Sequence, residues 1–158
     1  MKIRVGLGFD THILVKGRPL IIGGIHIPSP LGFQGHSDAD ILIHAICDSL
    51  LGAANLRDIG YHYPDIDLKY KDIDSKILLK DTYEMLQHKG WKIENIDATV
   101  VLEQPKLFSY IPLMKECLSE ILKITTDDIS IKAKTSEKMG FIGRAEGASA
   151  YAIALIKK

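Results

Sequence analysis

Three residues, from two separate segments of the chain, are of types that bind divalent metal ions. Asp10 and His12 lie two positions apart, so in a β-strand both side chains point to the same side. His44 lies in a segment with helical spacing of apolar residues. One carboxylate and two imidazoles are a common ligand set for catalytic zinc, which keeps a further position for water or substrate. The three residues therefore favour a zinc site.

Spacing alone leaves a plainer interpretation of these residues open. A single histidine in a helix is more often a packed boundary residue than a ligand, and the sequence does not show that His12 and His44 meet in space. The absence of cysteine from the set argues against a purely structural zinc site. Gly6-Leu7-Gly8 does not predict a dinucleotide-binding loop, because Thr11 stands where the third glycine is needed and no helix follows.

Two other segments combine groups that bind phosphate or a hard cation. His36-Ser37-Asp38 precedes an expected helix, whose first N–H groups and dipole suit an anion. The alternative is that Ser37 or Asp38 only caps the helix. Thr135-Ser136-Glu137-Lys138 follows an expected strand and combines hydroxyls, a carboxylate and an amine, a mixture that suits a cation and phosphate oxygens. Its alternative is a solvated turn.

The elements that carry the first three residues are a strand and a helix. Ile3, Val5 and Leu7 alternate with Lys2, Arg4 and Gly6, which predicts a half-buried strand with its apolar residues on the inner face. Apolar residues at spacings of three and four from 41 to 51 predict a helix that begins after Ser37 or Asp38 and ends near Ala54.

The rest of the chain alternates expected helices and strands. We predict a hairpin over 20–27, a polar loop through 58–67, a helix over 75–90 with Ile77, Leu78, Met85 and Leu86 inward, a strand over 96–102, a helix near 112–122, a strand over 129–133 and a last strand over 148–156 after a glycine-bearing loop. This order indicates one α/β (α+β) domain over residues 1–158, with a mixed β-sheet covered on one face by helices.

Composition limits the possible classes of function. Lys and Arg together number 20, as do Asp and Glu, so no excess of positive charge favours nucleic-acid binding. No apolar run approaches the roughly 20 residues that span a bilayer, and the N-terminus lacks a signal-peptide core. Cys47 and Cys117 fit free thiols in a reducing compartment. We expect a bacterial cytoplasmic protein, and a processed plastid protein has the same composition.

The ordered set of motifs resembles the 2-C-methyl-D-erythritol 2,4-cyclodiphosphate synthase family over nearly the whole chain. The motifs are Gly8 to His12, Gly35 to Ala54, Asp58-Ile59-Gly60 with Pro64-Asp65, and Lys132 to Gly147. The resemblance implies a lyase of the non-mevalonate isoprenoid route. It would cyclise 4-diphosphocytidyl-2-C-methyl-D-erythritol 2-phosphate to the 2,4-cyclodiphosphate and release CMP. It also implies a homotrimer with sites between subunits.

The resemblance also implies residue roles. Asp10, His12 and His44 would bind zinc, Glu137 would bind Mg²⁺ or Mn²⁺ that bridges the diphosphate, and His36 and Thr135 would stabilise the transition state. Substrate would contact a metal side made of Asp10, His12, His36, Ser37, Asp58, Ile59, Gly60, Tyr63, Pro64, Asp65 and Asp67. It would contact a cytidine side made of Pro105, Lys106, Leu107, Ala133, Lys134, Thr135, Ser136 and Glu137.

The resemblance further implies that three residues line a central cavity of the trimer. Phe9, Phe141 and Arg144 match positions that line this cavity, which is able to hold an isoprenoid diphosphate. Tyr151 departs from family members that carry a glutamate near the trimer axis.

Two other functions remain open at the level of sequence. One is a metal-dependent phosphoesterase, in which zinc activates water for hydrolysis. The other is a non-catalytic trimer that binds a nucleotide or an isoprenoid diphosphate. A missing metal ligand would favour the second, and none of the three is missing.

Overall fold

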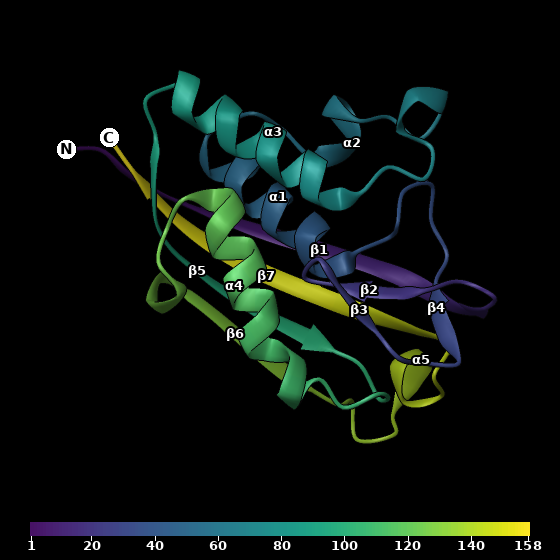
Figure 1. The fold of residues 1–158 in the computed structure, drawn as a ribbon. Coiled ribbons are helices and arrows are strands. Elements are labelled where there is room, and N and C mark those ends of the chain that lie inside the picture. The colour runs from purple at the N-terminus through teal and green to yellow at the C-terminus, as the bar shows by residue number, and fades with distance from the viewer.

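A five-stranded mixed sheet with helices on one face forms the protein (Figure 1). The computed structural model describes residues 1–158. The strand order is β4-β1-β7-β5-β6, in which β5 and β6 are parallel and the other pairs antiparallel. The strands of the sheet are β1 (Ile3–Lys16), β4 (Leu31–Phe33), β5 (Lys92–Val101), β6 (Ile129–Lys134) and β7 (Gly147–Lys157). The predicted α+β class and one-sided helical cover are confirmed.

Three longer helices lie on one side of the sheet, and shorter elements fill the connections (Figure 1). The longer helices are α1 (Ile41–Ala53), α3 (Ser75–His88) and α4 (Ile111–Leu122), and β2 (Leu20–Ile22) and β3 (Ile25–Ile27) form the predicted hairpin. The two expected loops contain the short helices α2 (Ile59–His62) and α5 (Gly140–Gly143). Single 3₁₀ turns span Leu68–Tyr70, Phe108–Tyr110 and Thr126–Asp128. None of the helices combines the length and the apolar character that a membrane crossing needs.

Helix α1 lies directly on two glycines of β1. A Cβ atom at Gly6 would lie 1.9 Å from the carbonyl oxygen of Ser49, and one at Gly8 would lie 1.8 Å from that of Ala45. No side chain fits at such distances, so only glycine permits this approach of helix to strand. Where α1 packs on it, the inner face of β1 therefore carries no side chains.

The outer face of β1 is apolar and exposed, which reverses the predicted burial. Ile3, Val5 and Leu7 are 53%, 65% and 68% exposed on the side of the sheet away from the helices. The prediction that they face the core was wrong, because alternation defines two faces of a strand and the helix packs on the glycine face. Other exposed apolar side chains of β1 and β7 continue this surface: Phe9, Ile13, Tyr151 and Ile153.

Strand β7 beneath α1 also presents small side chains. Ala148, Ala150, Ala152 and Ala154 are all buried, as the alternating alanines predict. Larger apolar side chains of α1, among them Ile43, fill the remaining space of the core. The small residues of β1 and β7 thus bring α1 close to the middle of the sheet.

Asp40, rather than Ser37 or Asp38, caps α1. Its carboxylate accepts hydrogen bonds from the N–H groups of Ile43 at 3.0 Å, Gly23 at 2.9 Å and Gly24 at 2.7 Å. The helix consequently begins at Ile41, and the same carboxylate holds the turn of the β2–β3 hairpin. Burial raises the pKa of Asp40 to about 6, although these hydrogen bonds lower it.

Helix α3 agrees with the predicted span and differs in one inward residue. Gly90 lies just beyond its end with φ +76°, the conformation for which glycine is favoured. Leu78 and Leu86 are buried as predicted, whereas Ile77 is 49% exposed. Asp74 caps the helix through the N–H of Lys76.

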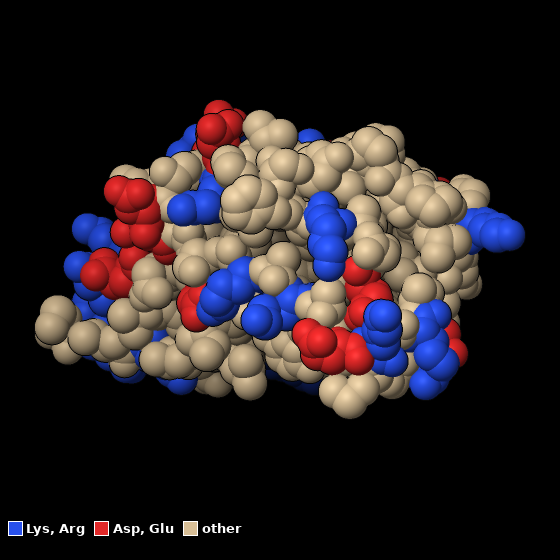
Figure 2. Space-filling model, turned by 90° about the horizontal axis from the view of Figure 1, so that it is seen from below, with Lys and Arg blue, Asp and Glu red and all other residues tan.

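Charged side chains are distributed without a dominant sign on the face seen from below. Figure 2 shows blue Lys and Arg side chains interspersed there with red Asp and Glu. Close ion pairs join Lys157 to Glu94 at 2.8 Å and Arg144 to Glu146 at 2.8 Å. Acidic and basic side chains are thus mixed on this face.

The three acceptor bonds of Asp40 predict a larger effect on stability than capping alone. In Asp40→Ala, loss of the cap and of acceptors for buried N–H groups should lower the free energy of unfolding by about 3 kcal/mol. Asp74→Ala is the matched control, since Asp74 caps α3 from a half-exposed position, and should lose about 1 kcal/mol. Urea unfolding followed by circular dichroism measures both. Equal losses would show that the contacts with the hairpin turn add nothing to capping.

Candidate metal centre and adjoining cavities

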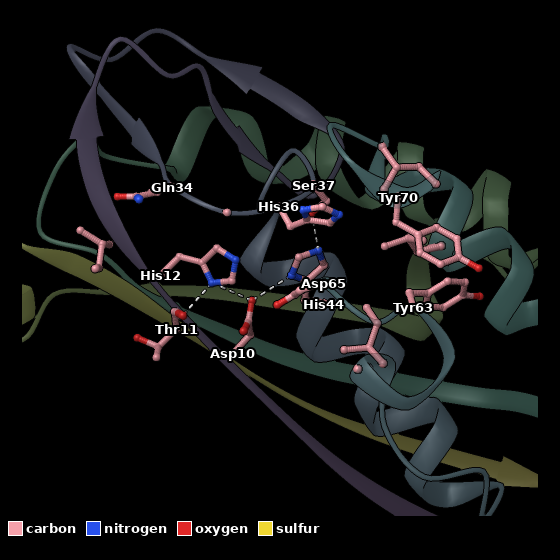
Figure 3. A pocket seen from close by; sticks show the side chains of 16 residues that line it. Asp10, Thr11, His12, Gln34, His36, Ser37, His44, Tyr63, Asp65 and Tyr70 are labelled. Carbon is pink, nitrogen blue, oxygen red and sulfur yellow. Dashed lines mark hydrogen bonds and ion pairs between the residues drawn. The ribbon is translucent and has the colours of Figure 1, made fainter. Parts of the chain in front are cut away.

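The predicted ligands converge at one end of a cavity. Asp10 and His12 come from β1 and His44 from the first turn of α1. Asp10 Oδ2 lies 3.0 Å from His44 Nδ1 and 3.2 Å from His12 Nδ1. One ligand atom from each residue lies within 4.8 Å of those of the other two. Figure 3 shows the carboxylate between the two imidazoles. The meeting of residues 12 and 44, which spacing left open, is therefore observed.

The glycine contact between β1 and α1 explains this convergence. Gly8 touches the helix at Ala45, the residue next to His44. Asp10 follows Gly8 by two positions and so points to the same face of the strand. Close packing at Gly8 therefore brings the carboxylate of Asp10 and the imidazole of His44 within reach of one ion.

The donor atoms have the chemistry that a divalent cation requires. His12 Nδ1 lies 2.6 Å from the carbonyl oxygen of Thr11, so the proton on Nδ1 can be donated there and Nε2 keeps a lone pair. Burial lowers the pKa of His44, but the hydrogen bond and negative charge of Asp10 outweigh burial and raise it above its usual value. Two imidazoles and one carboxylate at the edge of a cavity fit a cation that keeps an open position.

The cavity beside these residues has a volume of about 410 Å³ and contains most of the predicted metal-side contacts. Figure 3 shows Asp10, His12 and His44 on one side of the cavity and the rings of Tyr63 and Tyr70 on the other. The predicted residues in its lining are Asp10, His12, His36, Ser37, His44, Ile59, Gly60, Tyr63 and Asp65. His36 and Ser37 thus lie in the cavity wall, although α1 starts later than predicted, with Asp40 as its N-cap.

Asp58, Pro64 and Asp67 lie outside the lining and belong to the segments that form its wall. Asp58 caps α2 through the N–H of Tyr61 at 2.8 Å. The carbonyl oxygen of Asp67 lies 3.1 Å from His36 Nε2, which holds the imidazole against the loop. Two of these three residues therefore shape the wall by hydrogen bonds within the chain.

Several lining residues were not predicted from the sequence. They are Thr11, Ile13, Gln34, Gly35, Tyr70, Ile73 and Leu78. Asp48 is a further unpredicted contributor, because its Oδ1 accepts the N–H of Ile59 at 2.8 Å and ties α2 to α1. The spacing of four between Asp40, His44 and Asp48 was the available signal, since it puts all three on one stripe of the helix.

Four of the eight predicted cytidine-side residues line a separate cavity, and Pro105, Thr135, Ser136 and Glu137 do not. This cavity has a volume of about 590 Å³ and lies at the ends of β5 and β6. Lys106, Leu107, Ala133 and Lys134 line it together with Thr99, Phe108, Ile111 and Lys132. The two cavities share no lining residue. A single chain therefore does not unite the two predicted halves of the site in one cavity.

The Thr135–Lys138 segment is an ordered turn held by a residue that sequence reasoning missed. The carboxylate of Glu103 accepts the N–H groups of Ser136 and Lys138, each at 3.2 Å. Glu137 and Lys138 both have positive φ, at 54° and 62°. The only sequence signal was the position of Glu103 at the end of a strand, which does not identify its partners.

Phe141 and Arg144, two of the three residues predicted for a central cavity, differ in their surroundings. Phe141 lines a third cavity, of about 430 Å³, with Thr11, His12 and Glu146 among its neighbours. The guanidinium of Arg144 is paired with the Glu146 carboxylate, with distances of 2.8 Å and 3.1 Å from two of its nitrogens. Arg144 therefore already has an anionic partner within the chain.

Comparisons with known proteins agree on one family. The YgbB family model matches residues 3–157. Proteins named 2-C-methyl-D-erythritol 2,4-cyclodiphosphate synthase from Parabacteroides distasonis and Bacteroides thetaiotaomicron are 61% and 60% identical over the whole chain and are themselves covered to 98% and 99%.

Solved structures give the same result. A synthase of that name in a CDP-bound form has a TM-score of 0.90 and 34% identity, with 98% of this chain and 100% of that chain covered. A bifunctional IspDF from Campylobacter jejuni has a TM-score of 0.95 and 40% identity, and this chain covers 42% of it.

The convergence of ligands predicts that zinc binding depends on His44. In His44→Ala, loss of a direct ligand should raise the zinc dissociation constant by more than the roughly 100-fold typical of an outer-shell partner. Titration against a chromophoric chelator measures the constant. His26→Ala, which removes an exposed histidine of β3, is the control and should bind zinc as the unmodified chain does. Equal zinc affinity in the two variants would remove His44 from the ligand set.

Proposed function

The chain belongs to the YgbB family of 2-C-methyl-D-erythritol 2,4-cyclodiphosphate synthases, and we propose that its two cavities hold the two halves of one cytidine-linked substrate. It is an enzyme that cyclises 4-diphosphocytidyl-2-C-methyl-D-erythritol 2-phosphate to the 2,4-cyclodiphosphate, with release of CMP, in the non-mevalonate route. The observation that carries the proposed site is the Asp10, His12 and His44 cluster at the end of a cavity of about 410 Å³.

We further propose that residues 1–158 act as a single catalytic domain in the bacterial cytoplasm. The family match spans residues 3–157, and the similar proteins named above come from bacteria. The free cysteines Cys47 and Cys117 fit a reducing compartment.

Zinc is the ion we propose for Asp10, His12 and His44, and Mg²⁺ or Mn²⁺ the ion for Glu137. The first donor set is of nitrogen and oxygen type, which suits zinc, and the second is a carboxylate, which suits a hard cation. When bound, such ions withdraw negative charge from phosphate oxygens. The residues of the chain then have to orient two phosphate groups toward each other.

The reaction requires the protein to position the two phosphate groups of the substrate, and it needs no nucleophile from the protein. The 2-phosphate of the substrate attacks the β-phosphorus of the diphosphate, and CMP leaves as a stable phosphate monoester. Both groups are negatively charged, so donors fixed in advance lower the barrier to their approach. Burial raises the pKa of Cys47 to about 12, so this thiol does not ionise at neutral pH and is no candidate nucleophile.

His36 and Ser37 are the donors we assign to the phosphate on the metal side. The loop contact of His36 with the carbonyl of Asp67 limits the rotation of its ring. Ser37 is nearly buried, so its hydroxyl has few orientations. We assign the erythritol to the wall of the same cavity, formed by Asp58, Ile59, Gly60, Tyr63, Pro64, Asp65 and Asp67.

On the cytidine side, the second cavity supplies cations and a wall for a base. Lys106 and Lys134 line it beside Leu107 and Ala133. We assign the cytidine to these residues with Pro105, and the diphosphate to the turn of Thr135, Ser136 and Glu137, where Thr135 would donate to the transition state. Glu103 keeps that turn in place.

Assembly as a homotrimer would bring the two sides together between neighbouring subunits. The support is the exposed apolar surface of β1 and β7, because large exposed apolar patches mark interaction surfaces. Phe9 and Tyr151 pack against each other on it, with ring centroids 5.1 Å apart. Phe141 and Arg144, near the end of this sheet, are assigned to the central cavity of the trimer.

The cyclisation predicts a specific product and dependence on metal. With the candidate substrate, Mg²⁺ and zinc-loaded protein, phosphorus NMR should show the cyclic diphosphate together with CMP, and a chelator should abolish both signals. Inorganic phosphate or a linear diphosphate would instead support a phosphoesterase with zinc-activated water. Tight binding of CDP without turnover would support the non-catalytic binding protein.

The exposed apolar face predicts that one charge there prevents assembly. In Leu7→Glu, burial of a carboxylate between subunits should be unfavourable, so light scattering after size exclusion should give the mass of one chain, and turnover should fall at least about 100-fold. Ile77→Glu is the control, since Ile77 is exposed on α3 on the helical side. A Leu7→Glu variant that stays trimeric, or is active as a single chain, would contradict the interface.

A further inference from the structure

The imidazole of His44 has a defined partner on each of its two nitrogens. Nδ1 faces Asp10 Oδ2 at 3.0 Å, on the side of the proposed metal ion. Nε2 faces away from it and lies 3.0 Å from Ser75 Oγ and 3.2 Å from Ser37 Oγ. A nitrogen that binds a metal carries no proton, so a metal at Nδ1 requires the proton to be on Nε2. The partner of Nε2 must then be an acceptor.

Ser75 is such an acceptor because its own proton is already engaged. Its hydroxyl donates to Asp38 Oδ1 in a very short hydrogen bond, and its N–H donates to Asp38 Oδ2 at 3.0 Å. With the hydroxyl proton directed at a carboxylate, the lone pairs of Ser75 Oγ remain for the Nε2–H of His44. The order of donation is therefore from His44 to Ser75 and from Ser75 to Asp38.

The position of Ser75 separates it from the substrate. It is fully buried at the first residue of α3 and does not line the cavity. Ser37, the other neighbour of Nε2, lines the cavity and already accepts the N–H of Ala39 at 3.1 Å. Ser75 thus has no contact available to it except with the imidazole and the carboxylate, whereas the hydroxyl proton of Ser37 is free for a ligand in the cavity.

Asp38 is held so that it remains an acceptor. Besides the two bonds from Ser75, its Oδ1 accepts the N–H of Asp40 at 3.2 Å. In space, the carboxylate lies against Ser75, the first residue of α3, where the helix dipole favours a negative charge. The carboxylate accepts all three of these hydrogen bonds, and together they hold it against Ser75.

We propose that Asp38 and Ser75 are positioning residues that hold His44 in the tautomer with Nδ1 free for the metal ion. Histidine ligands commonly donate their second N–H to a carboxylate or carbonyl, which fixes the ring and strengthens the ligand. Here a serine hydroxyl stands between the imidazole and the carboxylate. The inference rests on the proposed metal site, and it assigns a role to two residues that do not touch metal or substrate.

The tautomer can be measured on the unmodified protein. In the zinc-loaded chain with ¹⁵N-labelled histidine, long-range proton–nitrogen NMR should show a zinc-bound Nδ1 and a protonated, slowly exchanging Nε2 for His44. A zinc-bound Nε2 would overturn the proposal and leave the metal site itself in place. Absence of zinc binding by the unmodified chain would overturn the metal site and the proposal together.

Substitution tests the contribution to affinity. In Ser75→Ala, the zinc dissociation constant should rise by about 10–100-fold, the usual effect of losing an outer-shell partner. Ser49→Ala is the matched control, because Ser49 is also fully buried and its hydroxyl donates to the carbonyl of Ile46 at 2.8 Å, away from His44. Thermal unfolding of the metal-free variants reports their folding. Wild-type zinc affinity in a folded Ser75→Ala variant would overturn the proposal.

A double-mutant cycle distinguishes a connected pair from two separate effects. If Asp38 acts through Ser75, Asp38→Asn should weaken zinc binding in the wild-type chain and have little further effect in the Ser75→Ala chain. Additive effects would mean that Asp38 acts on the metal by its charge alone and would refute the connection through Ser75. The tautomer measurement keeps the proposal testable if either variant fails to fold.

Discussion

The close contact between the backbone of α1 and the glycine face of β1 is the constraint on which the site depends. Gly6 and Gly8 leave no space between strand and helix, where even a methyl group would overlap a carbonyl oxygen. Because His44 belongs to the helix and Asp10 to the strand, their separation follows from this contact. Packing of backbone on backbone thus sets the distance between ligand atoms more directly than any side-chain interaction in the cavity does.

Carboxylates then connect the helix to the segments around it. Asp40 binds the turn of the β2–β3 hairpin, Asp48 binds the start of α2, and Asp38 binds the start of α3. Each accepts a backbone N–H group from another part of the chain. A buried N–H group without an acceptor costs free energy, so these carboxylates favour the one arrangement in which each N–H group is paired. Helix α1 and the residues just before it therefore organise the segments around the cavity.

The sequence predicted the ligand types and most of the elements, and it failed where the answer depended on tertiary contacts. Residue type and spacing made Asp10, His12 and His44 candidates, and the resemblance of the ordered motifs to a known family implied their role together. The buried face of β1 was not, since alternation gives two faces and only the packing of α1 selects the glycine one. Asp40 was missed as the cap because its other partners, Gly23 and Gly24, belong to a distant turn. Glu103 and Ser75 were missed for the same reason.

The arrangement of β1, β7 and α1 has a consequence for motion. Asp10 and His12 lie on a strand that is hydrogen-bonded to β7 from Ile3 to Ile13, and His44 lies on the helix that this part of the sheet supports. The cavity wall from Asp58 to Ile73 is made of one-turn helices and loop, with few buried residues. Amides of the ligand-bearing strand and helix should therefore exchange with solvent only when the whole molecule opens, and those of the wall through small local openings. The candidate site thus combines a rigid half, which carries Asp10, His12 and His44, with a wall of lower local stability.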